Sequence, residues 1–68
     1  MNVTQLSYSI NEYKNLYESG ELSKDEYKDL LEGLKQEKII HDTEEELKLK
    51  IGLQANITLA LKALSAVV

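Results

Sequence analysis

Residues 19–27 read Ser-Gly-Glu-Leu-Ser-Lys-Asp-Glu-Tyr, and this stretch predicts where one helix ends and the next begins. Gly20 can adopt the left-handed backbone conformation that commonly closes a helix. Ser23 is followed three residues later by Glu26, the spacing of a capping box, in which each side chain accepts a hydrogen bond from the backbone N–H of the other residue. The stretch therefore predicts the turn of a helical hairpin.

Apolar and aromatic residues recur at spacings of three and four on both sides of this turn, as they do along one face of a helix. The upstream residues are Val3, Leu6, Ile10, Tyr13 and Tyr17, and the downstream residues are Tyr27, Leu30, Leu31 and Leu34. Leu22 and Tyr27 also have the spacing of a hydrophobic staple around Ser23. We expect a first helix from about residue 3 to Ser19. Since no helix breaker precedes Ile39 and Ile40, residues 1–40 are expected to form the hairpin.

A third helix is predicted after the connection at residues 41–43. Thr43 with Glu46, or Asp42 with Glu45, offers another capping box, and the acidic run that follows suits the positive end of a helix dipole. The sequence leaves the role of the single histidine in this connection, His41, undecided.

The fold expected from these signals is one small all-α domain spanning residues 1–68. A helical hairpin, residues 1–40, is followed by a long apolar helix, residues 43–68, through which subunits assemble into an oligomeric bundle. A single core in so short a chain rarely supplies more than ~3–5 kcal/mol of stability. The chain has no cysteine and one histidine, so a disulfide framework or a thiolate metal site cannot supplement that core. Self-association remains as the expected source of additional stability.

Charge and hydropathy argue against nucleic-acid and membrane partners. The net charge is −4, and all eight basic residues are lysines, whereas phosphate and base recognition depend on arginine and a basic surface. The most apolar run, residues 51–68, is too short and too polar for a membrane span, which needs ~20 mostly apolar residues. No secretion signal is present, so we expect a location in the cytoplasm, or in a host cytoplasm or virion if a bacteriophage encodes the chain.

The third predicted helix has two apolar faces, although a surface helix needs only one. Large side chains form the first face: Leu53, Ile57, Leu61, Leu64 and Val68. Mostly small side chains form the second face: Gly52, Ala55, Leu59, Ala63 and Ala66. Because the hairpin can readily cover only one face, we expect the third helices of several subunits to pack together. An exposed apolar face of this kind typically marks an interface.

The predicted oligomer interface comprises Gly52, Leu53, Ala55, Asn56, Ile57, Leu59, Ala60, Ala63, Leu64, Ala66 and Val67. Within this set a heptad-like series, Leu53, Ile57, Ala60, Leu64 and Val67, is expected in or beside the core between subunits. Asn56 has two interpretations of equal standing: a buried polar residue that fixes register, or an exposed residue at the interface edge. The number of subunits and the direction of helix packing remain open at this stage.

Catalytic chemistry is not indicated by the sequence. It contains no cysteine nucleophile, glycine-rich phosphate loop or pair of histidines, so we predict neither an enzyme nor a cofactor. Tyr8 departs from the core stripe and could stack on a base or nucleotide. Together with Lys14, Lys24 and Lys28 it forms the candidate set for ligand or partner contacts.

Residues 13–34 resemble the short helical hairpin called the SHOCT domain. The matching positions are Gly20, Leu22, Ser23, Glu26, Tyr27, Leu30 and Leu31. The resemblance covers about a third of the chain, and it implies oligomerisation or protein binding rather than catalysis. That domain usually closes a longer protein, whereas here the hairpin comes first. The whole layout resembles small helical proteins encoded by bacteriophages, including virion and assembly components.

The leading functional expectation is therefore a homo-oligomeric helical module for protein–protein interaction, such as a phage structural or assembly protein. Two alternatives remain open. The first is an oligomer that binds or sequesters a small ligand such as a nucleotide. The second is an acidic regulator of a host protein.

Overall fold

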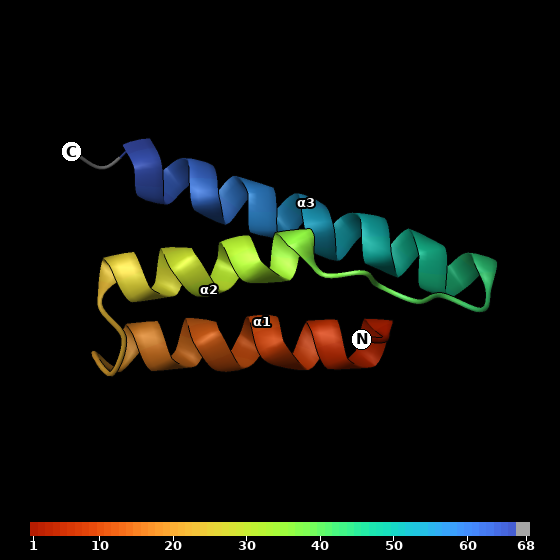
Figure 1. Cartoon of the computed structure of the whole chain (residues 1–68), viewed down its shortest axis with the longest axis horizontal. Helices are drawn as coiled ribbons and strands as arrows, with labels where there is room; N and C mark the ends of the chain where they lie inside the picture. Colours follow the sequence, from red (N-terminus) through yellow and green to blue (C-terminus); the bar gives the residue numbers. More distant parts are fainter. Residues whose placement is uncertain (67–68) are drawn as a thin grey trace.

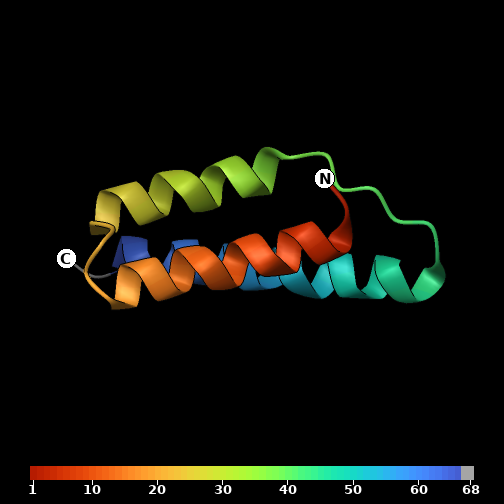
Figure 2. The same cartoon turned by 90° about the horizontal axis from the view of Figure 1, so that it is seen from below.

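The computed structural model describes residues 1–66, which contain three helices: α1 (Val3–Glu18), α2 (Lys24–Gln36) and α3 (Glu44–Ala66). Helices α1 and α3 run in the same direction and α2 runs opposite to both (Figure 1). Each helix contacts the other two, and the view from below shows α3 lying behind α1 (Figure 2). The all-α class and the hairpin-then-helix order are therefore confirmed.

The turn between α1 and α2 has the form that the sequence predicts. Gly20 has a φ of 86°, and its N–H donates to the Tyr17 carbonyl at 3.1 Å. The Glu21 N–H donates to the Leu16 carbonyl at 2.9 Å. These two bonds form a Schellman motif, which satisfies carbonyls left free by the end of the helix. Helix α1 therefore ends at the glycine because glycine adopts a positive φ without steric cost.

All three helices begin with a side-chain cap. Ser23 Oγ accepts from the Glu26 N–H at 3.1 Å, and Glu26 Oε1 accepts from the Ser23 N–H at 3.0 Å, which confirms the predicted capping box. Hydrogen bonds to the Glu26 carboxylate from the Ser23 backbone N–H and, to a smaller extent, from the Ser23 side chain hold the pKa of this carboxyl below its ordinary value of 4.5. Thr43 caps α3 by accepting from the Glu46 N–H at 3.1 Å. The Glu46 carboxylate, however, accepts from the Asp42 N–H, one residue earlier than in a standard capping box.

The cap of α1 was not predicted from the sequence. Asn2 Oδ1 accepts from the Gln5 N–H at 2.8 Å, and Gln5 Oε1 accepts from the Asn2 N–H at 2.9 Å. The signal is present in the sequence, since asparagine is a favourable N-cap residue and glutamine three positions later completes the reciprocal pair.

Helix α2 ends at Gln36, so the expectation that the helical hairpin continues through residue 40 is wrong at this end. Residues 37–40 instead form an extended strap, in which the Ile40 N–H donates to the Met1 carbonyl at 2.9 Å. Ile39 is 4% exposed and belongs to the core. Extended backbone suits β-branched residues such as these two isoleucines. It places the Ile39 side chain in the core and the Ile40 backbone beside the N-terminus.

The core lies where the three helices and the strap meet. Its buried members are Val3, Leu6, Tyr27, Leu31, Leu34, Ile39 and Ile57. Tyr13 and Tyr17 pack against it, as the periodicity predicts, and the Tyr17 and Tyr27 rings stack with their centroids 4.6 Å apart. Burial, with the nearby Glu18 carboxylate and Tyr17, raises the pKa of the Tyr27 phenol. Ile57 is the buried residue of α3, and half-buried residues from Leu53 to Leu64 pack against the core on either side of it.

Candidate interaction surface

Helix α3 carries two lines of residues at alternating spacings of three and four, on opposite sides. The inner seam faces the hairpin and consists of Glu46, Lys50, Leu53, Ile57, Ala60 and Leu64, all of them buried or half-buried. Ile57 is 1% exposed, and Leu53, Ala60 and Leu64 pack against the core of the same chain. The inner seam is therefore the contact between α3 and its own hairpin.

This placement changes the role expected for the heptad-like series. We expected Leu53, Ile57, Ala60 and Leu64 at or beside a core between subunits, but the structure uses them within one chain. Ile57 has no exposed surface to offer a second subunit. The fifth member of the series, Val67, lies outside the described residues. The sequence could not show this because both apolar sides of α3 are compatible with packing on the hairpin.

The outer seam runs along the opposite side of α3 and consists of Glu45, Lys48, Gly52, Ala55, Leu59, Lys62 and Ala66. All seven residues are exposed, and Leu59 is 63% exposed. Ile51, which is 59% exposed, and Ala63 flank this seam. Small residues therefore surround one large exposed leucine, with a charged residue near each end. As the sequence indicates, the hairpin covers only one side of the helix.

The predicted interface residues thus divide into two groups. Gly52, Ala55, Leu59 and Ala66 lie on the outer side, where they are exposed to solvent, whereas Ala63, which is also exposed, lines the apolar groove with Tyr17 and Tyr27 of the hairpin. Asn56 is also exposed, beside the outer seam, and exposure in a single chain is compatible with both interpretations of this residue. Leu53, Ile57, Ala60 and Leu64 belong to the inner side. The outer group is the part of the prediction that remains available to a partner.

The charges on the outer seam have no partners within the described chain. Across residues 1–66 the structure gives neither the Glu45 carboxylate nor the Lys48 and Lys62 ammonium groups an ion pair. An ion pair does join Lys14 and Glu18 on α1 at 3.9 Å, but both side chains are more than 60% exposed. Pairs in that setting contribute little stability. The outer seam therefore presents charges of both signs to solvent.

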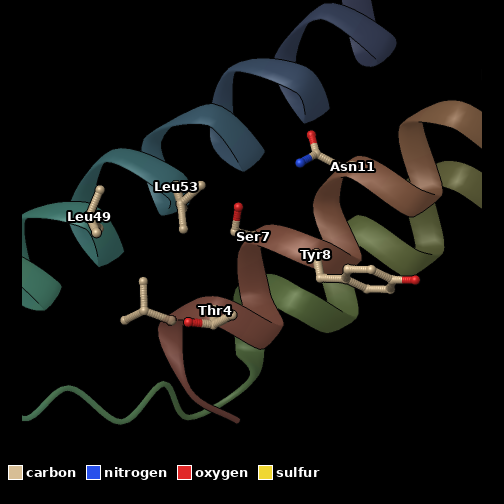
Figure 3. A pocket seen from close by; sticks show the side chains of 7 residues that line it. Thr4, Ser7, Tyr8, Asn11, Leu49 and Leu53 are labelled. Carbon is tan, nitrogen blue, oxygen red and sulfur yellow. The ribbon is translucent and has the colours of Figure 1, made fainter.

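A shallow groove of about 410 Å³ lies between α1 and the first half of α3 (Figure 3). Its α1 wall carries the small polar side chains Thr4, Ser7 and Asn11, and its α3 wall carries Leu49 and Leu53. Ser7 and Asn11 point into the gap between the helices, whereas the Tyr8 ring extends away from α3 (Figure 3). Sequence reasoning missed the polar wall, because small polar residues on an outer helix face carry no distinguishing pattern.

The four residues proposed for ligand or partner contacts do not converge. Tyr8 is 72% exposed and lines three grooves along α1, and none of these three is lined by a lysine. Lys14 lines a separate apolar groove with Tyr17 and Tyr27. Lys24 and Lys28 are half-buried on α2. A single chain therefore brings no lysine into the grooves around Tyr8.

Three further observations bear on function. Within residues 1–66, no group of three or more histidine, cysteine or acidic side chains is arranged to hold a metal ion. None of the helices in this range combines the length and the apolar character that crossing a membrane requires. No protein family, curated protein or solved structure matches the chain.

Proposed function

We propose that this chain is a self-associating helical module for protein–protein interaction and that the outer seam of α3 is its interface. The exposure of Leu59 carries the proposal. This side chain is 63% exposed in the middle of a helix whose opposite side is anchored in the core, and Ile51 beside it is 59% exposed. Isolated exposed leucines are common, but one that stands among exposed alanines, glycine and isoleucine forms a contiguous apolar patch.

The composition of this patch favours a helix as the partner. Gly52, Ala55 and Ala66 have little or no side chain, so the axis of a second helix can approach α3 closely. Leu59 would then supply most of the apolar area removed from water. Full burial of one leucine side chain stabilises by about 1.5–3 kcal/mol. For a chain whose core supplies only ~3–5 kcal/mol, such a contact is a large addition.

We extend the proposal to a structural or assembly role, on the resemblance of the layout to small helical bacteriophage proteins. The ligand-binding alternative has less support, because Tyr8 and Lys14 line different grooves. A nucleotide site that uses both would need walls from more than one subunit.

Sedimentation equilibrium of the wild type and two matched variants tests the interface. Leu59→Lys places a charge in the outer seam, whereas Ile40→Lys makes a similar change at a residue that is 55% exposed in the strap. We expect Leu59→Lys to weaken association by tenfold or more, since ~1.4 kcal/mol corresponds to a factor of ten and each copy contributes one leucine. Ile40→Lys should associate like the wild type. Equal association of all three proteins would show that the outer seam is not the interface.

A further inference from the structure

We infer that the occupant of the outer seam is a second copy of the chain in antiparallel orientation, with Glu45 of each copy opposite Lys62 of the other. This inference rests on the proposed function and adds the direction and register of the contact. It follows from the order of charged and small residues along the seam and from the fact that all of them are exposed in the single chain.

The register follows from the spacing of the seam. In an antiparallel pair, facing positions have residue numbers with a constant sum. Placing Glu45 opposite Lys62 therefore places Lys48 opposite Leu59 and Gly52 opposite Ala55. In this register every seam residue from Glu45 to Lys62 faces a seam residue of the other copy, as the core positions of an antiparallel coiled coil do. The two helices then cross between their two smallest facing residues, where the axes can come closest.

Charge decides between the two directions. A parallel pair in register would place Glu45, Lys48 and Lys62 each against its own copy, giving three layers of like charge. The antiparallel register gives two layers of opposite charge, one at each end of the contact. Lys48 then faces an apolar residue, Leu59, against which its methylene chain can pack while the ammonium group stays in water. Opposed helix dipoles favour the same direction.

The fold leaves room for this arrangement. Helix α3 lies along one edge of the bundle, and its outer side is turned away from α1 and α2 (Figure 1). A second copy on that side would place the two α3 helices at the centre and the two hairpins at the outside. Neither Glu45 nor Lys62 has an ion-pair partner within residues 1–66 of its own chain, so no existing pair has to be broken.

Charge exchange tests the pairing. Glu45→Lys and Lys62→Glu each create two like-charge layers in the antiparallel pair, and we expect each to weaken association by about tenfold or more. The double variant again places opposite charges at each end of the contact. Because the two residues face each other, their effects are coupled, and association should return to within a few-fold of the wild type. Glu12→Lys on the exposed side of α1 changes the net charge as Glu45→Lys does, so it is the matched control for that variant and should associate like the wild type.

Cysteine cross-linking tests the direction independently, because the chain has no native cysteine. Lys48→Cys mixed with Leu59→Cys should form a disulfide-linked heterodimer. Lys48→Cys alone should not cross-link, since its two copies would lie ~16 Å apart along the helix axis, beyond the reach of a disulfide.

The outcomes separate this inference from the proposed function. A wild-type chain that stays monomeric would overturn both. A wild-type dimer in which Lys48→Cys alone cross-links, or in which the charge-exchanged double variant stays as weak as the single variants, would overturn the antiparallel register while self-association stands.

Discussion

Ile57 and Leu59 lie two positions apart on α3 and face opposite sides of it: Ile57 is 1% exposed, and Leu59 is 63% exposed. The first residue fixes the helix to its own hairpin. The second is the large apolar residue of the outer seam. Two apolar residues of similar size thus have different environments, because a helix turns by about 100° at each residue.

Truncation of these two residues should separate folding from association. Ile57→Ala removes a fully buried side chain, and such changes cost about 2–5 kcal/mol, comparable with the whole stability expected of so small a chain. We expect circular dichroism to show loss of helix at every protein concentration. Leu59→Ala should keep its helical content, and its melting temperature should depend less on concentration than that of the wild type, because it weakens association alone. Equal destabilisation of both variants in dilute solution would contradict this assignment.

The strap offers a second matched pair. Ile39 is 4% exposed and Ile40 is 55% exposed, although the two are identical neighbours. Ile39→Ala should lower the free energy of unfolding by about 2–5 kcal/mol, and Ile40→Ala should change it by less than about 1 kcal/mol. Chemical denaturation of the two variants measures the difference. Equal losses of stability in the two variants would contradict the burial of Ile39 and the exposure of Ile40.

Substitution of two glycines by alanine should change the stability of the chain in opposite directions. Gly20 has a φ of 86°, which alanine adopts only at a cost of about 1–2 kcal/mol, so Gly20→Ala should destabilise the chain. Gly33 lies inside α2 with open space around it, so Gly33→Ala should stabilise the helix by up to about 1 kcal/mol. Thermal unfolding of both variants tests the turn. A stabilised Gly20→Ala variant would show that the Schellman turn is misplaced.

The capping box of α2 predicts an acid-dependent loss of stability. Hydrogen bonds from Ser23 lower the pKa of Glu26 in the folded chain, so the ionised form is favoured by folding. This contribution is present above the ordinary pKa of 4.5 and is lost as the pH falls through the lower folded value. An NMR titration of the Glu26 carboxyl should give a midpoint below 4.5, closer to 4.5 in Ser23→Ala. A midpoint at or above 4.5 in the wild type would contradict the box.

Local signals account for most of what the sequence predicts correctly. Gly20, Ser23 and Thr43 mark helix boundaries because each satisfies backbone groups within a few residues of itself, independently of the rest of the fold. The end of α2 could not be read in this way. The strap exists because Ile40 meets the N-terminus and Ile39 meets the core, and both contacts join segments distant in the sequence.

The sequence predicts only part of the candidate surface, because the rest depends on contacts between segments distant in the sequence. The sequence shows that α3 has two apolar faces and that the hairpin can readily cover only one, and residues of both faces are predicted at the interface. It does not show that the series containing Ile57 is occupied by the hairpin, because only the packing of the three helices decides which face turns inward. Nor does it show that Tyr8 and Lys14 lie in separate grooves.

The mass of the native assembly shows whether the chain associates through α3. The chain has a mass of 7.7 kDa, so a pair of copies would have twice that mass, 15.4 kDa. We predict that native mass spectrometry of the wild type at micromolar concentration gives the 15.4 kDa species and that Leu59→Lys shifts the population toward 7.7 kDa. A helical wild-type chain found only at 7.7 kDa at micromolar concentration would show that the outer seam does not join two copies.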